Sequence, residues 1–178
     1  MDSCYDWMIE ARAMAPQWLR LTLFVHLFLF ALVAGVFWGT WFSLSRSMNA
    51  IGASTFLEVG HTMIANLGGP MAVLMPATLV SAVPVLFGLY RQRRRASFAL
   101  LLAGTGLLVV ALAITLSVNV PIDYAINEWT LDTLPTDWRN IRNRWETYHA
   151  ARTFISMTGF GLALAAAVGT RDDGAATP

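Results

Sequence analysis

The 178-residue sequence contains a single cysteine, Cys4, and no lysine. A lone cysteine cannot form an internal disulfide, and it excludes a metal or redox centre built from several thiolates. Glycine-rich dinucleotide loops, P-loops and serine nucleophile elbows are also missing, so no stored organic cofactor is expected. Charged residues make up only 13% of the chain. Any chemistry must therefore rest on the few positions where charge occurs.

The basic residues are all arginine, and their arrangement argues against a nucleic-acid partner. The longest basic run, Arg91 to Arg95, directly follows an apolar segment, where arginines act as a topology signal for membrane insertion. The other arginines do not form a patch of the kind that binds a phosphate backbone. The sequence therefore predicts no binding to nucleic acid.

Apolar residues are what the chain has in abundance. They make up 56% of it, and the mean hydropathy is +0.54, which is too apolar for a soluble globule. A helix needs about 20 residues to cross the hydrocarbon core of a membrane. The chain has four apolar segments of roughly this length, which predict an all-α integral membrane four-helix bundle. These segments are residues 19–44, 70–90, 96–118 and 153–168.

Capping and proline patterns set the expected boundaries around the second span. Thr55 and Glu58 have the spacing of a capping box, so a short helix is expected from there to Leu67. The residues Gly68-Gly69-Pro70 follow it. The span after them is expected to be kinked and packed inside the bundle, because it contains Pro76 and Pro84.

The third and fourth spans carry similar signals. Pro121 lacks a backbone donor, so the third helix is expected to end there. Gly104 and Gly106 lie in this span, where small residues allow helices to approach closely. The polar segment 138–152 reads as a helix that continues directly into the fourth span.

The chain is expected to form one transmembrane domain, residues 19–170, between an interfacial leader, residues 1–18, and a disordered tail, residues 171–178. The first apolar stretch is too long for a cleavable signal peptide. With four spans, seven arginines fall on the side of the two termini and five on the other. Both termini of this multi-pass protein are therefore expected in the cytoplasm, with polar helical extensions on the extracytoplasmic side of the cell membrane.

The connection between the last two spans is the expected functional region. Residues 119–152 hold five of the eleven acidic residues, four of the twelve arginines and three of the seven tryptophans. Within it, Glu146 and His149 lie at i and i+3, so both face one side of a helix. Glu58 and His61 repeat that spacing ahead of the second span, and the topology places both pairs on the same side of the membrane.

A metal site is the sharpest hypothesis that this duplication supports. Paired Glu-x-x-His motifs hold the metals of di-iron bundles, and histidines with carboxylates also form mononuclear non-haem iron sites. The ligands would be Glu58, His61, Asp123, Glu146 and His149, with iron or copper as the metal. The alternative is structural, with Glu58 as part of the capping box and Glu146 paired with Arg142 or Arg144 on an exposed face.

His149 and Arg152 form a second i, i+3 pair at the start of the fourth span. His149 could accept a proton while Arg152 holds an anionic oxygen, because imidazole titrates near neutral pH and guanidinium does not. Alternatively, Arg152 could extend to the membrane interface and pair with Glu146 or Asp123. His26, on an otherwise apolar helix, is expected to have a structural role.

Amides and tryptophans complete the set of candidate site residues. Asn66 and Asn119 lie at the level of the charged residues, and Asn119 could instead satisfy backbone groups freed by Pro121. Trp38, Trp41 and Trp145 fall near the outer boundary. Tryptophans there form an interfacial belt or stack on a flat substrate.

Through several of these residues, the sequence resembles the anthrone oxygenase-like family of membrane proteins. The resemblance covers about residues 20–168, which contain the four predicted spans. Its motifs are the aromatic and small-residue stretch 34–43, Asn119-x-Pro121, Trp138, Arg144-Trp145 and His149-x-x-Arg152. The resemblance implies a four-helix membrane protein, and some family members convert an anthrone to an anthraquinone in aromatic polyketide tailoring.

Carried over by position, the family's active-site group would be Asn119, Trp145, His149 and Arg152. Asp123 stands where the family often has asparagine, which favours a metal or a cationic, amine-bearing substrate. The expected function is therefore a membrane oxygenase that tailors a small specialised metabolite, either with a metal or without a cofactor and with His149 as base. The alternative is a non-enzymatic transporter or accessory subunit. Membrane lipid, a small-molecule substrate and further copies of the chain are the expected partners.

Overall fold

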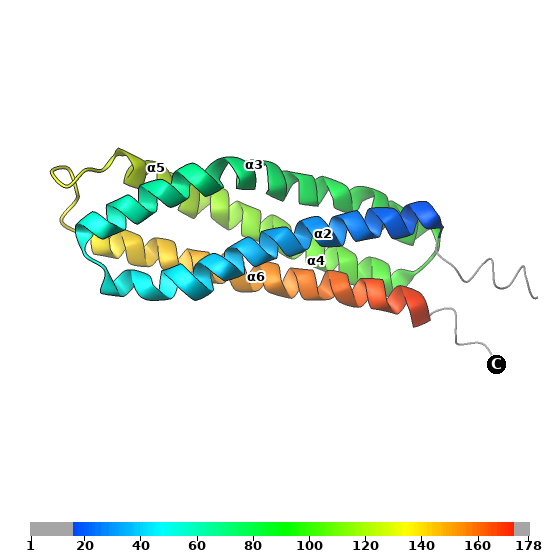
Figure 1. Ribbon diagram of the computed structural model, residues 1–178. Helices are drawn as coiled ribbons and strands as arrows, with labels where there is room; N and C mark the ends of the chain where they lie inside the picture. Colours follow the sequence, from blue (N-terminus) through cyan, green and yellow to red (C-terminus); the bar gives the residue numbers. More distant parts are fainter. Residues whose placement is uncertain (1–15, 173–178) are drawn as a thin grey trace, which may run out of the picture.

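The computed structural model describes residues 16–172, which are helical apart from short connections and contain no strand (Figure 1). The predictions for residues 1–15 and 173–178 lie outside the described residues. The elements are α2 (Gln17–Gly39), a π-helical turn η1 (Thr40–Leu44), a 3-10 segment η2 (Ser45–Ala50), α3 (Ala53–Arg91), α4 (Arg95–Ile114), a π-helical turn η3 (Thr115–Asn119), α5 (Val120–Glu128) and α6 (Trp138–Asp172).

The prediction of an all-α bundle of four helices able to span a membrane is confirmed. Within residues 16–172, four helical stretches are long and apolar enough to cross a membrane: Gln17–Leu44, Ala53–Arg91, Arg95–Glu128 and Trp138–Gly169. Many large apolar side chains point outward from them, including Phe24, Val73 and Val110. An apolar exterior of this kind is expected of a protein whose surroundings are lipid.

The most extensive helix contact is between α4 and α6, and two glycines let their backbones approach closely. A Cβ atom added to Gly104 would lie 2.6 Å from the carbonyl oxygen of Gly159, and one added to Gly159 would lie 2.8 Å from that of Gly104. Two backbones approach this closely only where side chains are absent. The predicted contact at Gly104 is confirmed, whereas Gly106 has no neighbouring atom within 4 Å of an added Cβ.

The break expected at residues 68–70 is absent, because α3 runs without interruption from Ala53 to Arg91 and contains Pro70, Pro76 and Pro84. The capping box is also wrong: the N-cap residue is Gly52, and no side chain caps the helix. Proline removes only one hydrogen bond, and in an apolar environment no water competes for the remaining backbone groups. The long helix therefore persists.

Pro121 does not end the third span either. The chain passes from α4 through the π-helical turn η3 into α5, where Pro121 is the second residue. A proline ring inside an α-helix clashes with the carbonyl group four residues earlier, here that of Ser117. The wider π-helical turn directly before Pro121 relieves this crowding and lets the helix continue.

The two ends of the bundle are formed by different elements (Figure 1). The start of α2, the α3 to α4 connection and the end of α6 lie together at one end. The other end holds η2, α5 and the starts of α3 and α6. The segments 45–66 and 119–152 therefore meet at one end of the bundle, as expected, and the side of the membrane on which they lie stays a prediction.

Candidate functional site

A cavity of about 480 Å³ lies inside the half of the bundle that holds the two π-helical turns. Its volume falls within the range of about 300–1,000 Å³ that is usual for small-molecule sites. Its walls are mainly apolar and come from α2, α3, α4, α5 and α6 together with η1, η2 and η3. Four methionines contribute flexible, polarisable surface: Met48, Met63, Met71 and Met75.

The charged and aromatic residues that α6 contributes to the cavity share one face of that helix. Arg142, Trp145, His149 and Arg152 all line the cavity, and their spacing of three, four and three residues places them in one stripe. Asp123 from α5 and Thr115 from η3 join them. One end of an otherwise apolar chamber is therefore polar.

His149 and Arg152 are buried together, with 1% and 7% of their surfaces exposed. Nε and Nη2 of Arg152 lie 3.2 and 3.1 Å from Nδ1 of His149, and Nη1 donates to Thr115 Oγ1 at 3.0 Å. The guanidinium carbon also lies 4.6 Å from the centre of the Phe37 ring. The alternative in which Arg152 extends to the membrane interface is therefore wrong, because its side chain is buried and lines the cavity.

Asp123 and Trp145 continue this polar row. Trp145 Nε1 donates to Asp123 Oδ1 at 2.7 Å, and the indole ring stacks on the imidazole of His149 with centres 4.9 Å apart and planes 15° apart. The row therefore runs from Asp123 through Trp145, His149 and Arg152 to Thr115. Each member fixes the position of the next, as a preorganised site requires.

Asn119 lies behind the row and does not line the cavity. It is fully buried, and its Nδ2 donates to the backbone carbonyl of Trp145 at 3.2 Å. Its Oδ1 has no hydrogen-bond partner among the described residues. The contact ties the third span to α6 at the level of Trp145, so the structure gives Asn119 a positioning contact.

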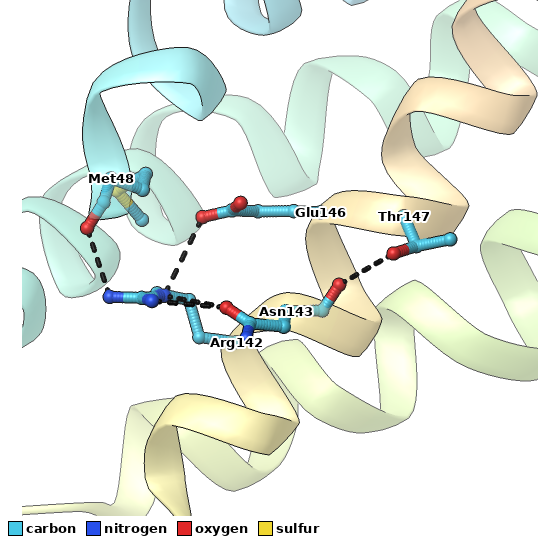
Figure 2. A network of polar contacts seen from close by, with 5 residues as sticks. All are labelled: Met48, Arg142, Asn143, Glu146 and Thr147. Atoms are coloured by element: carbon cyan, nitrogen blue, oxygen red, sulfur yellow. Dashed lines mark hydrogen bonds and ion pairs between the residues drawn. The ribbon is translucent and has the colours of Figure 1, made fainter.

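Arg142 binds the 3-10 segment η2 through Met48 (Figure 2), and both residues line the cavity. Its Nη1 donates to the carbonyl oxygen of Met48 at 3.0 Å, and Nε and Nη2 donate to Asn143 Oδ1. Glu146 Oε1 lies 3.6 Å from Nε, so the alternative in which Glu146 pairs with Arg142 is confirmed, but the pair does not lie on an exposed face because the Arg142 side chain is buried. Glu146 does not line the cavity.

The five predicted metal ligands do not converge. Glu58 is exposed, and His61 uses Nε2 to donate to the carbonyl oxygen of Ile126 at 2.9 Å. Within residues 16–172, no group of three or more histidine, cysteine, aspartate or glutamate side chains is arranged to hold a metal ion. The residues present therefore do not fit the proposed iron or copper centre.

Three of the four predicted substrate-binding residues lie outside the cavity. Trp38 and Trp41 pack against each other and against Phe154, and none of these three lines the cavity. Asn66 is exposed and also lies outside it. Only Trp145 takes the predicted place.

His26 is separated from this site. It is fully buried, and its Nδ1 lies 2.9 Å from Ser81 Oγ and 3.2 Å from the carbonyl oxygen of Thr78. These contacts join α2 to α3. They agree with a structural role, which stays a prediction.

Sequence reasoning missed Thr115 and the methionine walls. Thr115 belongs to an apolar span, and its own Oγ1 also donates to the carbonyl oxygen of Ala111, as is common for a threonine inside a helix. Only its contact with Arg152 distinguishes it. The turn that contains it was a possible signal, because π-helical turns are frequent at functional sites.

The cavity reaches the outer surface of the bundle between α3 and the third span. Leu116 and Tyr124 line it and are nevertheless 59% and 72% exposed. On the α3 side, Gly68 and Ala72 are also exposed lining residues. These residues belong to stretches apolar enough to cross a membrane, so this opening faces sideways from the bundle.

A family model described as anthrone oxygenase matches residues 62–162. The match covers more than half of the chain and includes every member of the row from Thr115 to Arg152. No curated protein and no solved structure matches the chain.

Proposed function

The chain belongs to the anthrone oxygenase family, and from this premise we propose that it is a membrane oxygenase acting on a flat, apolar, oxygen-bearing aromatic substrate. The reaction converts an activated CH₂ group into a carbonyl group with molecular oxygen as the oxidant. The apolar walls suit the ring system of such a substrate, and the polar end suits its oxygen atom. The observation that carries the proposal is the buried Arg152, held beside His149 at the end of the cavity.

The CH₂ group of an anthrone is acidic because the negative charge left by the departing proton spreads onto the carbonyl oxygen across the ring. A fixed guanidinium group in a water-poor cavity stabilises such an oxyanion strongly. Arg152 is already held by His149 and Thr115, so little reorganisation is needed when the charge develops. This preorganisation supports an assignment of Arg152 to the substrate oxygen.

The rest of the reaction balances with dioxygen alone. The carbanion and O₂ form a carbon–oxygen bond, and protonation gives a hydroperoxide. Loss of the remaining hydrogen on that carbon, together with cleavage of the O–O bond, releases water and leaves the carbonyl group. One CH₂ group and one O₂ thus become one carbonyl group and one water molecule.

Oxygen uptake by the full chain purified in detergent tests this function. With hydroxylated anthrones as substrates, we expect quinone formation above the rate of spontaneous oxidation, with one O₂ consumed per carbonyl formed. Label from ¹⁸O₂ should appear in the new carbonyl group. Turnover that persists in a chelator, at a metal content far below one equivalent, would support a metal-free reaction.

Two results would contradict the proposal. A rate equal to that of empty detergent micelles with every anthrone would remove the assigned activity. Activity that is lost on chelation and restored by iron or copper would show that the reaction needs a metal, and would contradict oxidation by dioxygen alone.

Narrowing the sideways opening should hinder a substrate that arrives through the lipid phase. A Cβ atom added to Gly68 would have no neighbouring atom within 4 Å, so Gly68→Phe places a ring at the opening without displacing its neighbours. We expect a several-fold higher KM in lipid nanodiscs and a nearly unchanged kcat. Gly106→Phe is the matched control, because Gly106 is equally free of neighbours and lies outside the cavity. Equal KM values for the two variants would contradict this route.

A further inference from the structure

The reaction above needs a proton acceptor, and the cavity offers two candidates besides water. These are the imidazole of His149 and the carboxylate of Asp123, both of which line the cavity. Histidine is the more frequent general base in enzymes. The hydrogen bonds around the two residues distinguish them.

Arg152 determines which nitrogen of His149 carries the proton. Its Nε and Nη2 both lie within 3.2 Å of Nδ1, and a guanidinium group has donors and no acceptor. Nδ1 must therefore accept, so the neutral ring carries its proton on Nε2. Protonation at Nδ1 would turn two donors toward each other and place a second positive charge beside Arg152. His149 in this arrangement has no free lone pair for a substrate proton.

Asp123, in contrast to His149, has an oxygen that can accept a substrate proton. Its Oδ1 accepts a hydrogen bond from Trp145 Nε1 at 2.7 Å, which fixes the orientation of the carboxylate. Among the described residues, no hydrogen bond engages its second oxygen, Oδ2. A carboxylate oriented through one oxygen and free at the other is arranged to accept a proton from a molecule in the cavity.

We propose that Asp123 Oδ2 takes the proton from the CH₂ group of the substrate, while His149 stays neutral and holds Arg152 in place. This inference rests on the function proposed above and assigns the base within it. The C–H bond breaks, its electron pair stays on the substrate, and the proton passes to Oδ2. The proton leaves Oδ2 again when it protonates the peroxide anion, and it ends in the water that is released when the O–O bond breaks. Trp145 is a positioning residue that acts through Asp123.

The test compares Asp123→Asn with His149→Gln in the purified full chain. Asparagine keeps an oxygen that can accept from Trp145, so the fold should be retained, but it cannot take the proton. We expect kcat to fall by about 10²- to 10⁴-fold, the usual contribution of a general base. A deuterated CH₂ group should also give a larger isotope effect on kcat than in the unmodified protein. His149→Gln keeps an acceptor for Arg152 and should have a clearly smaller effect.

Chemical rescue gives a second measurement. Asp123→Ala with added formate should recover part of the lost activity, because a small carboxylate can occupy the space left by the side chain, whereas formate should not help His149→Gln. Asp132→Asn, an exposed residue of the connection before α6, is the matched control and should behave like the unmodified protein. Asp123→Glu replaces Asp123→Asn if the latter does not fold, and should keep more activity than Asp123→Ala.

The outcomes separate the two proposals. Near-normal kcat in Asp123→Asn together with a large loss in His149→Gln would overturn the assignment of Asp123 and leave the oxygenase function standing. An unmodified chain that oxidises no anthrone would overturn both.

Discussion

Arg152→Met is expected to lower kcat for anthrone oxidation by about 10²- to 10³-fold, the loss usually seen when one oxyanion-stabilising donor is removed. Methionine keeps an unbranched apolar chain over the Phe37 ring, where the guanidinium carbon now lies 4.6 Å from the ring centre. It cannot place positive charge at the end of the cavity. Initial rates of quinone formation and O₂ uptake, measured at saturating substrate, give the comparison.

Two further variants make this result specific. Arg144→Met changes an exposed arginine of the same helix and should leave kcat unchanged. Arg152→Lys restores the charge, but one ammonium group cannot reproduce a fork in which Nη1 bonds Thr115 while Nε and Nη2 face His149. It should recover only part of the activity. A normal kcat in Arg152→Met would contradict the assigned role of the guanidinium group.

Gly104→Val is expected to give the largest loss of stability. The first added carbon would lie 2.6 Å from the carbonyl oxygen of Gly159, so α4 and α6 must move apart. Overpacking of this kind costs about 1–3 kcal/mol, and sometimes more. The midpoint of thermal unfolding in detergent should therefore fall. Activity should fall with it, because Thr115 and Arg152 meet across the same two spans.

Gly106→Val is the matched control for this substitution. Gly106 belongs to the same helix, and an added Cβ there meets no atom within 4 Å. Its unfolding midpoint should stay close to that of the unmodified protein. Equal losses in the two variants would mean that a valine in α4, rather than the contact with Gly159, causes the effect.

The sequence was sufficient to predict the parts of the fold that depend on local composition. Runs of apolar residues predicted four spans, since their length alone decides whether a helix can cross a membrane. The spacing of His149 and Arg152 placed them together on one helix face, because helical periodicity fixes which residues share a face, and Trp145 was expected beside them only from the family resemblance. Glu146 and Arg142 pair for the same reason, one turn apart.

Contacts between distant helices could not be read from such patterns. Glu58 and His61 repeat the spacing of Glu146 and His149, but the repeat does not determine which way each helix faces, and His61 bonds the backbone of Ile126 instead. Trp38 and Trp41 pack against each other outside the cavity. Spacing defines the face of one helix, whereas a site also requires the angle between helices.

The prolines misled for a related reason. Rules for helix ends derive mainly from soluble proteins, where water competes for the backbone groups that a proline frees. In α3 the prolines are absorbed within one helix of 39 residues. Before Pro121 the helix instead widens into one π-helical turn. No single residue of this segment predicts such a turn.

That turn has a consequence for how the site can vary. A π-helical turn holds one residue more than the α-helical turn it replaces, so deleting one residue between Thr115 and Asn119 would restore ordinary α-helical winding and leave the later residues of the third span near their present positions. Winding all five residues as α-helix would instead turn every later residue by about 100° about the helix axis, and Asp123 would leave Trp145. The π-helical winding of this segment therefore sets the angular phase of α5 relative to α4.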